Sequence, residues 1–426
     1  MKRVYHLWLG MISLCSALVA PTQQLILRAP KDNDVLPSIS PLGEQQHDHH
    51  KQPDTVSTQL VDKFDNPRGD SSQPTSPPHD LLSKKTIYEL ITTSKHTTIL
   101  AKIVNDDKGL IQLLNSTKTN HTLFAPNDHA FHGKTPDMSK DVLRDTILYH
   151  VVPGVYPATS IFHHRTLSTA HEEPLLNSLP QRLTVRLGWR GISLNYQSRI
   201  IAIDICASNG IIHTINHVLT PPPRILKNIE STPVQFSTFT LGLLRTNLLS
   251  TLDTENVTSH PGGTIFAPSN QAFGRLGART TAYLFSPAGE GLLRALLKYH
   301  IVPGRTLYSD VVYTAAREIQ PFGTEGSTHL NLPTMLHDGE LGVDVVRIGP
   351  YASLSVNGRR RVVFPDVLAR DGNLFVVDRV LIPPKEVDCE VLGWTEEQDD
   401  DDEGIILEDL ISRLECYTGE IKRYEL

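Results

Sequence analysis

The sequence predicts an α+β fold built from two tandem copies of one domain, because three phrases occur twice and in the same order along the chain. The two occurrences lie 142, 150 and 162 residues apart for the first, second and third phrase. The second copy is therefore longer by 8 residues between its first two phrases and by 12 between its last two, in segments expected to be loops. The phrases are TLFAPNDHAF (122–131) and TIFAPSNQAF (264–273), LYHVVPG (148–154) and KYHIVPG (298–304), and NGIIHTINHVLTPP (209–222) and DGNLFVVDRVLIPP (371–384).

Helices are expected at the start of each copy. Residues 86–89 (TIYE) fit a capping box, in which Thr86 and Glu89 satisfy each other's backbone donors. Apolar residues follow at helical spacing from Leu90 to Val104, and the second copy opens in the same way between Phe236 and Leu249.

Strands are expected in the later part of each copy, where apolar and polar residues alternate. Both copies end in a proline pair, which cannot continue a strand ladder. Because each copy has helices first and strands afterwards, the pattern favours an α+β domain over a doubly wound parallel sheet. The alternating segments are LTVRL (183–187) and ISLNY (192–196), then LSVNG (354–358) and RVVF (361–364).

The chain divides into five segments. An apolar run after Lys2 and Arg3 predicts a signal peptide over 1–20, and a polar, proline-rich composition predicts a disordered linker over 21–83. The two copies occupy 84–223 and 233–385. Residues 386–426 form an acidic tail whose apolar spacing near its end is compatible with a helix.

Composition excludes several classes of partner. A net charge of -7 offers no basic surface for a phosphate backbone, so we expect no nucleic-acid partner. No second long apolar segment follows the signal, so we expect no transmembrane anchor. The cysteines and histidines lack the spacing of a zinc site, and we expect neither a metal nor a cofactor.

A secretory route also predicts covalent modification. Three Asn-X-Thr or Asn-X-Ser sequons, at Asn115, Asn120 and Asn256, precede the first phrase of each copy, and we expect a glycoprotein. Cys389 and Cys416 bracket the acidic tail and are candidates for one disulfide.

The repeated phrases resemble the signature blocks and the central Tyr-His of the fasciclin-type domain, the module of fasciclin and periostin-like adhesion proteins. The resemblance covers 84–223 and 233–385. It implies a wedge of β-strands with a helical layer, in secreted, cell-surface and matrix proteins; some fungal relatives are associated with vacuoles.

The Tyr-His pairs are the shared positions with the best claim to a binding role. The resemblance implies that Tyr149, His150, Tyr299 and His300 are candidate contacts for a partner. The alternative is a buried histidine that is hydrogen-bonded to the backbone. No nucleophile or carboxylate recurs at fixed spacing beside these pairs, so we expect no catalytic residues.

The two copies also differ, which predicts that their surfaces have diverged. His213 in the third phrase is replaced by Phe375 in the second copy. The extra length around 312–370, including Arg359 to Arg361, is expected to have no counterpart in the first copy.

These observations favour a non-enzymatic protein of the secretory pathway whose two domains serve adhesion or scaffolding at a cell surface, in a matrix or in a vacuole. Its partners would be proteins or glycans, and its oligomeric state is left open. An Arg-Gly-Asp tripeptide at Arg68, Gly69 and Asp70 would be accessible to a receptor in the linker. The alternatives are a hydrolase that acts on extracellular or vacuolar polymers, and a lumenal factor in vacuolar membrane traffic that acts through the C-terminal helix.

Overall fold

The computed structural model describes residues 84–131, 139–252, 262–349, 351–358, 360–384 and 407–424. Several predicted features lie outside the described residues: the signal peptide, the linker with its Arg-Gly-Asp tripeptide, Asn256, Cys389 and the side chain of Cys416.

The first domain begins with helices, as the capping box predicts. Thr86 caps α2 by accepting from the Glu89 backbone, and the Glu89 carboxylate accepts from the Thr86 backbone in return. The apolar faces of α2, α3 and α4 pack into one buried cluster with strand β1. The helical elements are α2 (Ile87–Thr93), α3 (Thr98–Asn105), α4 (Lys108–Asn115), η2 (Asp128–Phe131), α5 (Lys140–His150), α6 (Ala158–Ile161) and η3 (Pro174–Leu176).

The rest of the first domain is a seven-stranded sheet in the order β2-β1-β7-β6-β5-β4-β3. Strands β1 and β7 carry the first and third phrases and pair in parallel, while the other neighbours are antiparallel. The fold is therefore mixed α+β, as predicted. The strands are β1 (His121–Pro126), β2 (Val151–Pro153), β3 (Thr166–Glu173), β4 (Leu179–Gly188), β5 (Gly191–Leu194), β6 (Ser198–Ala207) and β7 (Gly210–Ile215).

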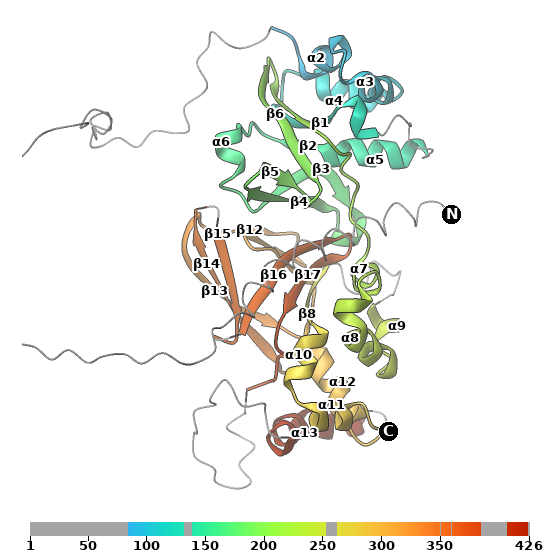
Figure 1. Cartoon of the computed structure of the whole chain (residues 1–426), viewed down its shortest axis with the longest axis vertical. Coiled ribbons are helices and arrows are strands. Elements are labelled where there is room, and N and C mark those ends of the chain that lie inside the picture. Colours follow the sequence, from blue (N-terminus) through green and yellow to red (C-terminus); the bar gives the residue numbers. More distant parts are fainter. Residues whose placement is uncertain are drawn as a thin grey trace, which may run out of the picture. The chain divides into compact units, whose positions relative to one another are not determined.

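The second domain repeats this order in the sheet β9-β8-β17-β16-β15-β14-β13 (Figure 1). It adds helix α11 and a three-stranded sheet, β10-β11-β12. Its helices are α7 (Ile225–Glu230), α8 (Pro233–Arg245), α9 (Leu248–Leu252), α10 (Asn270–Arg275), α11 (Ala278–Leu284) and α12 (Glu290–Tyr299). Its strands are β8 (Gly263–Pro268), β9 (Ile301–Pro303), β10 (Arg305–Leu307), β11 (Val311–Thr314), β12 (Ile319–Pro321), β13 (Glu325–Pro333), β14 (Glu340–Ile348), β15 (Tyr351–Val356), β16 (Arg360–Ala369) and β17 (Gly372–Val377).

The glycine of each third phrase has a structural cause. Gly210 and Gly372 both have φ of 150°. A Cβ at either position would overlap the backbone carbonyl of His121 or Gly263 on the neighbouring parallel strand. Glycine is therefore required for β7 and β17 to approach β1 and β8.

The expected location of the extra length is wrong in part. Eleven residues separate Gly154 from β3, whereas twenty separate Gly304 from β13, so most of the insertion forms β10, β11 and β12. Arg361 does have a counterpart, because it pairs with Ser355 on β15 as Arg199 pairs with Ser193 on β5.

The C-terminal segment forms a helix, α13 (Leu407–Tyr424), that packs against α12. Leu410 and Leu414 have no exposed surface and belong to the core of the second domain. The apolar face of α13 is thus already covered within this chain (Figure 1).

Candidate functional site

The histidine of each Tyr-His pair joins the second phrase to the third. The Nδ1 atom of His150 lies 2.7 Å from the Thr146 carbonyl oxygen, and its Nε2 accepts from the Leu219 backbone at 2.9 Å. His300 makes the same two contacts, with the Leu296 carbonyl at 2.8 Å and the Leu381 backbone N–H at 2.9 Å. A neutral ring that donates from Nδ1 and accepts at Nε2 satisfies both contacts.

Burial keeps both rings uncharged. It lowers the pKa of His150 and of His300 to about 4, although the hydrogen bond to the helix carbonyl acts in the opposite direction. Neither ring has a free nitrogen with which to abstract a proton from a substrate.

The tyrosine of each pair connects its helix to a hairpin of the sheet. Tyr149 donates to the Arg182 carbonyl at 2.8 Å and accepts from the Asn195 side chain at 2.8 Å. Tyr299 donates to the Glu340 carbonyl at 3.1 Å and accepts from Asn357 at 2.9 Å. Burial raises the pKa of Tyr299 to about 12, and that of Tyr149 also rises for the same reason.

The two asparagines were missed in the sequence, although they are 162 residues apart like the third phrase. Asn195 and Asn357 both have positive φ, 46° and 50°, which a short polar side chain tolerates. That shared offset, outside the three phrases, was the available signal.

All four predicted contact residues are therefore internal. Tyr149, His150, Tyr299 and His300 each have 0% exposure. A partner has no atom of theirs to touch in this conformation, so any contact at these phrases would have to use neighbouring surface residues.

His213, which the second copy lacks, is also a core residue. Its Nδ1 accepts from the Asp204 backbone at 3.2 Å and its Nε2 lies 2.9 Å from the Tyr156 carbonyl oxygen. The ring stacks on Phe124, as Phe375 stacks on Phe266 in the second domain. The replacement exchanges one buried stacking ring for another.

The modification candidates are placed only in part. Asn115 and Asn120 are exposed, and the Asn115 side-chain oxygen accepts from the Thr86 hydroxyl at 2.7 Å. That contact leaves the Asn115 nitrogen, which is the atom that carries a glycan, outside the hydrogen bond. Cys206 is a free, half-exposed thiol.

The inserted strands of the second domain pack directly on the first domain. Tyr313 on β11 donates to the Pro180 carbonyl at 3.0 Å, and Gln181 donates to the Ala369 carbonyl at 3.2 Å. One buried apolar cluster contains residues of both domains: Leu176 and Leu179 with Tyr308, Val311, Tyr313 and Leu368.

A polar layer lies beside this shared cluster. The Asp310 carboxylate accepts from the Thr166 backbone at 2.7 Å and from the Thr166 hydroxyl at 2.6 Å, and it lies 3.7 Å from Arg182. Burial opposes the charge on Arg182, yet Asp310 and Tyr313 raise its pKa overall. These contacts are satisfied only when the two domains are together, so the junction fixes their relative orientation.

Asp310→Asn is expected to lower the free energy of unfolding by about 2 kcal/mol, because it leaves the Arg182 charge buried without its partner. Chemical denaturation of the full chain measures the change. Asp338→Asn is the matched control, since its side chain is 71% exposed and should change stability by less than about 0.5 kcal/mol. Equal effects of the two substitutions would contradict a structural role for Asp310.

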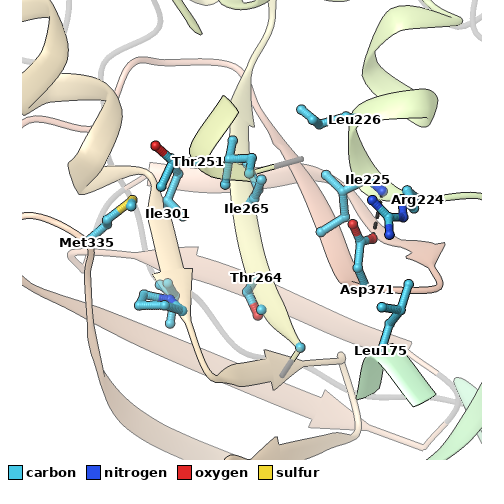
Figure 2. Close-up of a pocket in the computed structure, with 15 residues that line it drawn as sticks. Leu175, Arg224, Ile225, Leu226, Thr251, Thr264, Ile265, Ile301, Met335 and Asp371 are labelled. Atoms are coloured by element: carbon cyan, nitrogen blue, oxygen red, sulfur yellow. Dashed lines mark hydrogen bonds between the residues drawn. The ribbon is translucent and has the colours of Figure 1, made fainter. Parts of the chain in front are cut away.

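A small pocket opens at the same junction (Figure 2). It has a volume of about 90 Å³ and is lined by Leu175 of the first domain and by Ile265, Ile301 and Asp371 of the second. The Asp371 carboxylate, whose pKa is raised by burial, accepts from the Ile225 backbone at 2.8 Å. Pockets for small-molecule ligands are typically about 300 to 1,000 Å³, so this one is too small for a polymer or a drug-sized ligand.

Comparison with known proteins identifies the fold's family. The Fasciclin domain model matches residues 95–221 and 234–383. The chain belongs to the fasciclin domain family, and the resemblance seen in the three phrases is confirmed.

The relatives differ in how much of their length this chain covers. "Aurofusarin biosynthesis cluster protein S" of Gibberella zeae is 27% identical, over 72% of this chain and 80% of that protein. "Transforming growth factor-beta-induced protein ig-h3" of Sus scrofa is 25% identical over 71% of this chain but 38% of its own length. Mouse stabilin-2 is 25% identical over 62% of this chain and 10% of its own length. The solved domain pair of insect fasciclin I matches 66% of this chain and 95% of that chain, at 17% identity and a TM-score of 0.32.

Two searches of the described residues found no further site. No described helix is both long and apolar enough to cross a bilayer. No group of three or more His, Cys, Asp or Glu side chains within the described ranges is arranged to hold a metal ion.

Proposed function

We propose that this protein is a non-enzymatic protein of the secretory pathway whose two fasciclin domains act as one module for adhesion or scaffolding at a cell surface, in a matrix or in a vacuole. Fasciclin domains are interaction modules of adhesion and matrix proteins. The observation that carries the proposal is the shared junction, because it presents both domains to a partner as one rigid surface.

The junction changes how a two-domain binder would work. Independent modules on a flexible linker gain avidity through effective concentration. Here the orientation is set in advance, so a partner that touches both domains would not pay the entropy of ordering them. Deleting one domain would uncover the shared apolar cluster, so binding has to be tested in the full chain.

Binding of the full chain to cell-surface, cell-wall or matrix preparations tests this function. We expect saturable binding that is lost when the chain is unfolded before mixing. No binding above that of an unrelated protein of similar size and negative charge would refute the proposal. A tag placed within 21–83 leaves both domains free and, in microscopy, separates surface, medium and vacuole.

The hydrolase alternative finds little support in the described residues. The shared histidines have no free nitrogen, and the junction pocket has a volume of about 90 Å³. The traffic alternative relied on an available C-terminal helix, whereas Leu410 and Leu414 are buried against the second domain.

A second candidate function is an accessory role in a biosynthetic pathway. The Gibberella zeae protein, whose name places it in an aurofusarin biosynthesis cluster, matches this chain over 80% of its own length, against 38% and 10% for ig-h3 and stabilin-2. The two-domain architecture as a whole therefore resembles that protein. Gene deletion tests this candidate: a changed metabolite profile with unchanged surface binding favours it over adhesion.

We propose that Asn115 and Asn120 carry N-linked glycans, since both side chains are exposed. We also retain the disulfide between Cys389 and Cys416 as a proposal. Mass spectrometry of the secreted chain, with and without deglycosylation and reduction, tests both modifications.

A further inference from the structure

Two arginines without an acidic partner lie where the first domain meets β16 of the second. Arg165 stands opposite Val185 in the β3–β4 ladder, where its carbonyl accepts from the Val185 backbone at 2.8 Å. Arg186 is the next residue on β4, and both arginines are half-buried. We call this pair and its surroundings the arginine seam.

Neutral groups hold Arg186 in place. Its Nη2 donates to the Tyr196 hydroxyl at 2.7 Å and to the Pro365 carbonyl of the second domain at 3.1 Å. Its guanidinium also lies over the rings of Tyr196 and Phe364, at 5.0 and 5.6 Å. Burial raises the pKa of Tyr196 to about 12, so this hydroxyl contributes no negative charge.

Arg165 is less well satisfied. Its Nε is buried without a hydrogen-bond partner. Burial lowers the pKa of Arg165, and the charge of Arg186 lowers it further, which places the two guanidinium groups close together. Within the described residues neither group lies within ion-pair distance of a carboxylate.

The carboxylates of the junction are already engaged. Asp310 binds Thr166 and lies beside Arg182, while Asp366 accepts from the backbone and hydroxyl of Ser309 at 2.8 and 2.5 Å. A fourth arginine, Arg347, donates to backbone carbonyls, including that of His163 at 3.2 Å. The arginines at this junction thus outnumber the aspartates, and two positive charges remain uncompensated.

We propose that the arginine seam binds an oxyanion, namely the carboxylate or sulfate group of an acidic polysaccharide, between Arg165 and Arg186. A guanidinium fork matches the geometry of a carboxylate or sulfate and forms strong charge-assisted hydrogen bonds with it. Such a ligand would supply the missing partner of Arg165. The inference rests on the proposed surface function and names a class of ligand for it.

The seam is specific to the first domain in its contact with the second. In the second domain the register of β14 with β15 places Asp344 where β4 carries Arg186. Gly358, which follows Asn357, stands where Tyr196 follows Asn195. The second domain therefore carries the opposite charge at the equivalent position.

Binding of the full chain to three polymers tests the inference: polygalacturonate with carboxylates, dextran sulfate with sulfates, and neutral dextran. We expect binding to at least one charged polymer and none to neutral dextran. Arg165→Gln is expected to weaken that binding about tenfold, whereas Arg165→Lys keeps the charge and most of the affinity. Arg190→Gln is the matched control, because Arg190 is exposed at the β4–β5 turn and should change affinity less than about twofold.

A stability readout separates binding from folding. Inorganic sulfate should raise the Tm of the wild type and have a smaller effect on Arg165→Gln. Failure of both charged polymers to bind, or equal losses in Arg165→Gln and Arg190→Gln, would overturn the inference. If Arg165→Gln loses no polymer affinity but the chain still binds cell surfaces, the seam is refuted and the proposed function stands. If the polymers bind through Arg165 but no surface binds the chain, the seam stands and the proposed function fails.

Discussion

Replacing His150 or His300 by alanine is expected to lower the free energy of unfolding by about 3 to 5 kcal/mol. Each ring is fully buried and bridges a helix carbonyl to the backbone of the third phrase. Removing the ring opens a cavity and leaves a buried N–H and a buried carbonyl oxygen with one partner fewer. Chemical denaturation of each variant measures the loss.

His213→Phe is the matched control for these substitutions. The second domain already carries Phe375 at this position, stacked on Phe266 as His213 stacks on Phe124. We expect this change to cost about 1 to 2 kcal/mol, because the ring is replaced although the hydrogen bond to Asp204 is lost. A His150→Ala variant with wild-type stability and reduced partner binding would instead make His150 a contact residue.

Lowering the pH from 7.5 to 5 is expected to reduce the free energy of unfolding by about 2 kcal/mol for each of His150 and His300. The folded pKa of each is about 4, below the model value of 6.5, so the unfolded chain takes up protons first as the pH falls. The contribution of each ring is therefore fully present above pH 6.5 and is lost between about 6.5 and 4. Burial also lowers the pKa of His121, His164 and His213, which adds to the loss in the same direction.

Denaturation of the wild type and of His300→Asn across this pH range measures the effect. Asparagine retains a donor and an acceptor but does not titrate, so the pH dependence of the variant should be smaller by about 2 kcal/mol. Equal stability of the wild type at pH 7.5 and 5 would show that the rings are not held neutral. The outcome also bears on destination, because an acidic vacuole would cost this protein more stability than a neutral extracellular medium.

The sequence predicted those parts of the fold that the two copies share. The capping box at Thr86, the helical start of each domain and the strands of the third phrase are all present. The phrases recur together because they touch: each histidine of the second phrase binds backbone in the third, and β1 pairs with both β2 and β7. Repetition thus revealed contacts that one copy alone would not have shown.

The sequence did not predict the junction. Its contacts join residues such as Thr166 and Asp310, which are far apart in the chain and occur once each. Phrase offsets show how much length the second copy gained but not where the gain lies, which is why Arg359 to Arg361 were wrongly assigned to it. Burial of the Tyr-His pairs was one of two readings of the pattern, and only packing distinguishes them.

The central claim is that the two fasciclin domains behave as one structural unit. Differential scanning calorimetry of residues 84–426 tests this claim most directly. We predict a single transition whose calorimetric enthalpy equals its van't Hoff enthalpy, because the shared cluster and the Asp310 contacts couple the two domains. Two separate transitions in the wild type, unchanged by Asp310→Asn, would contradict it.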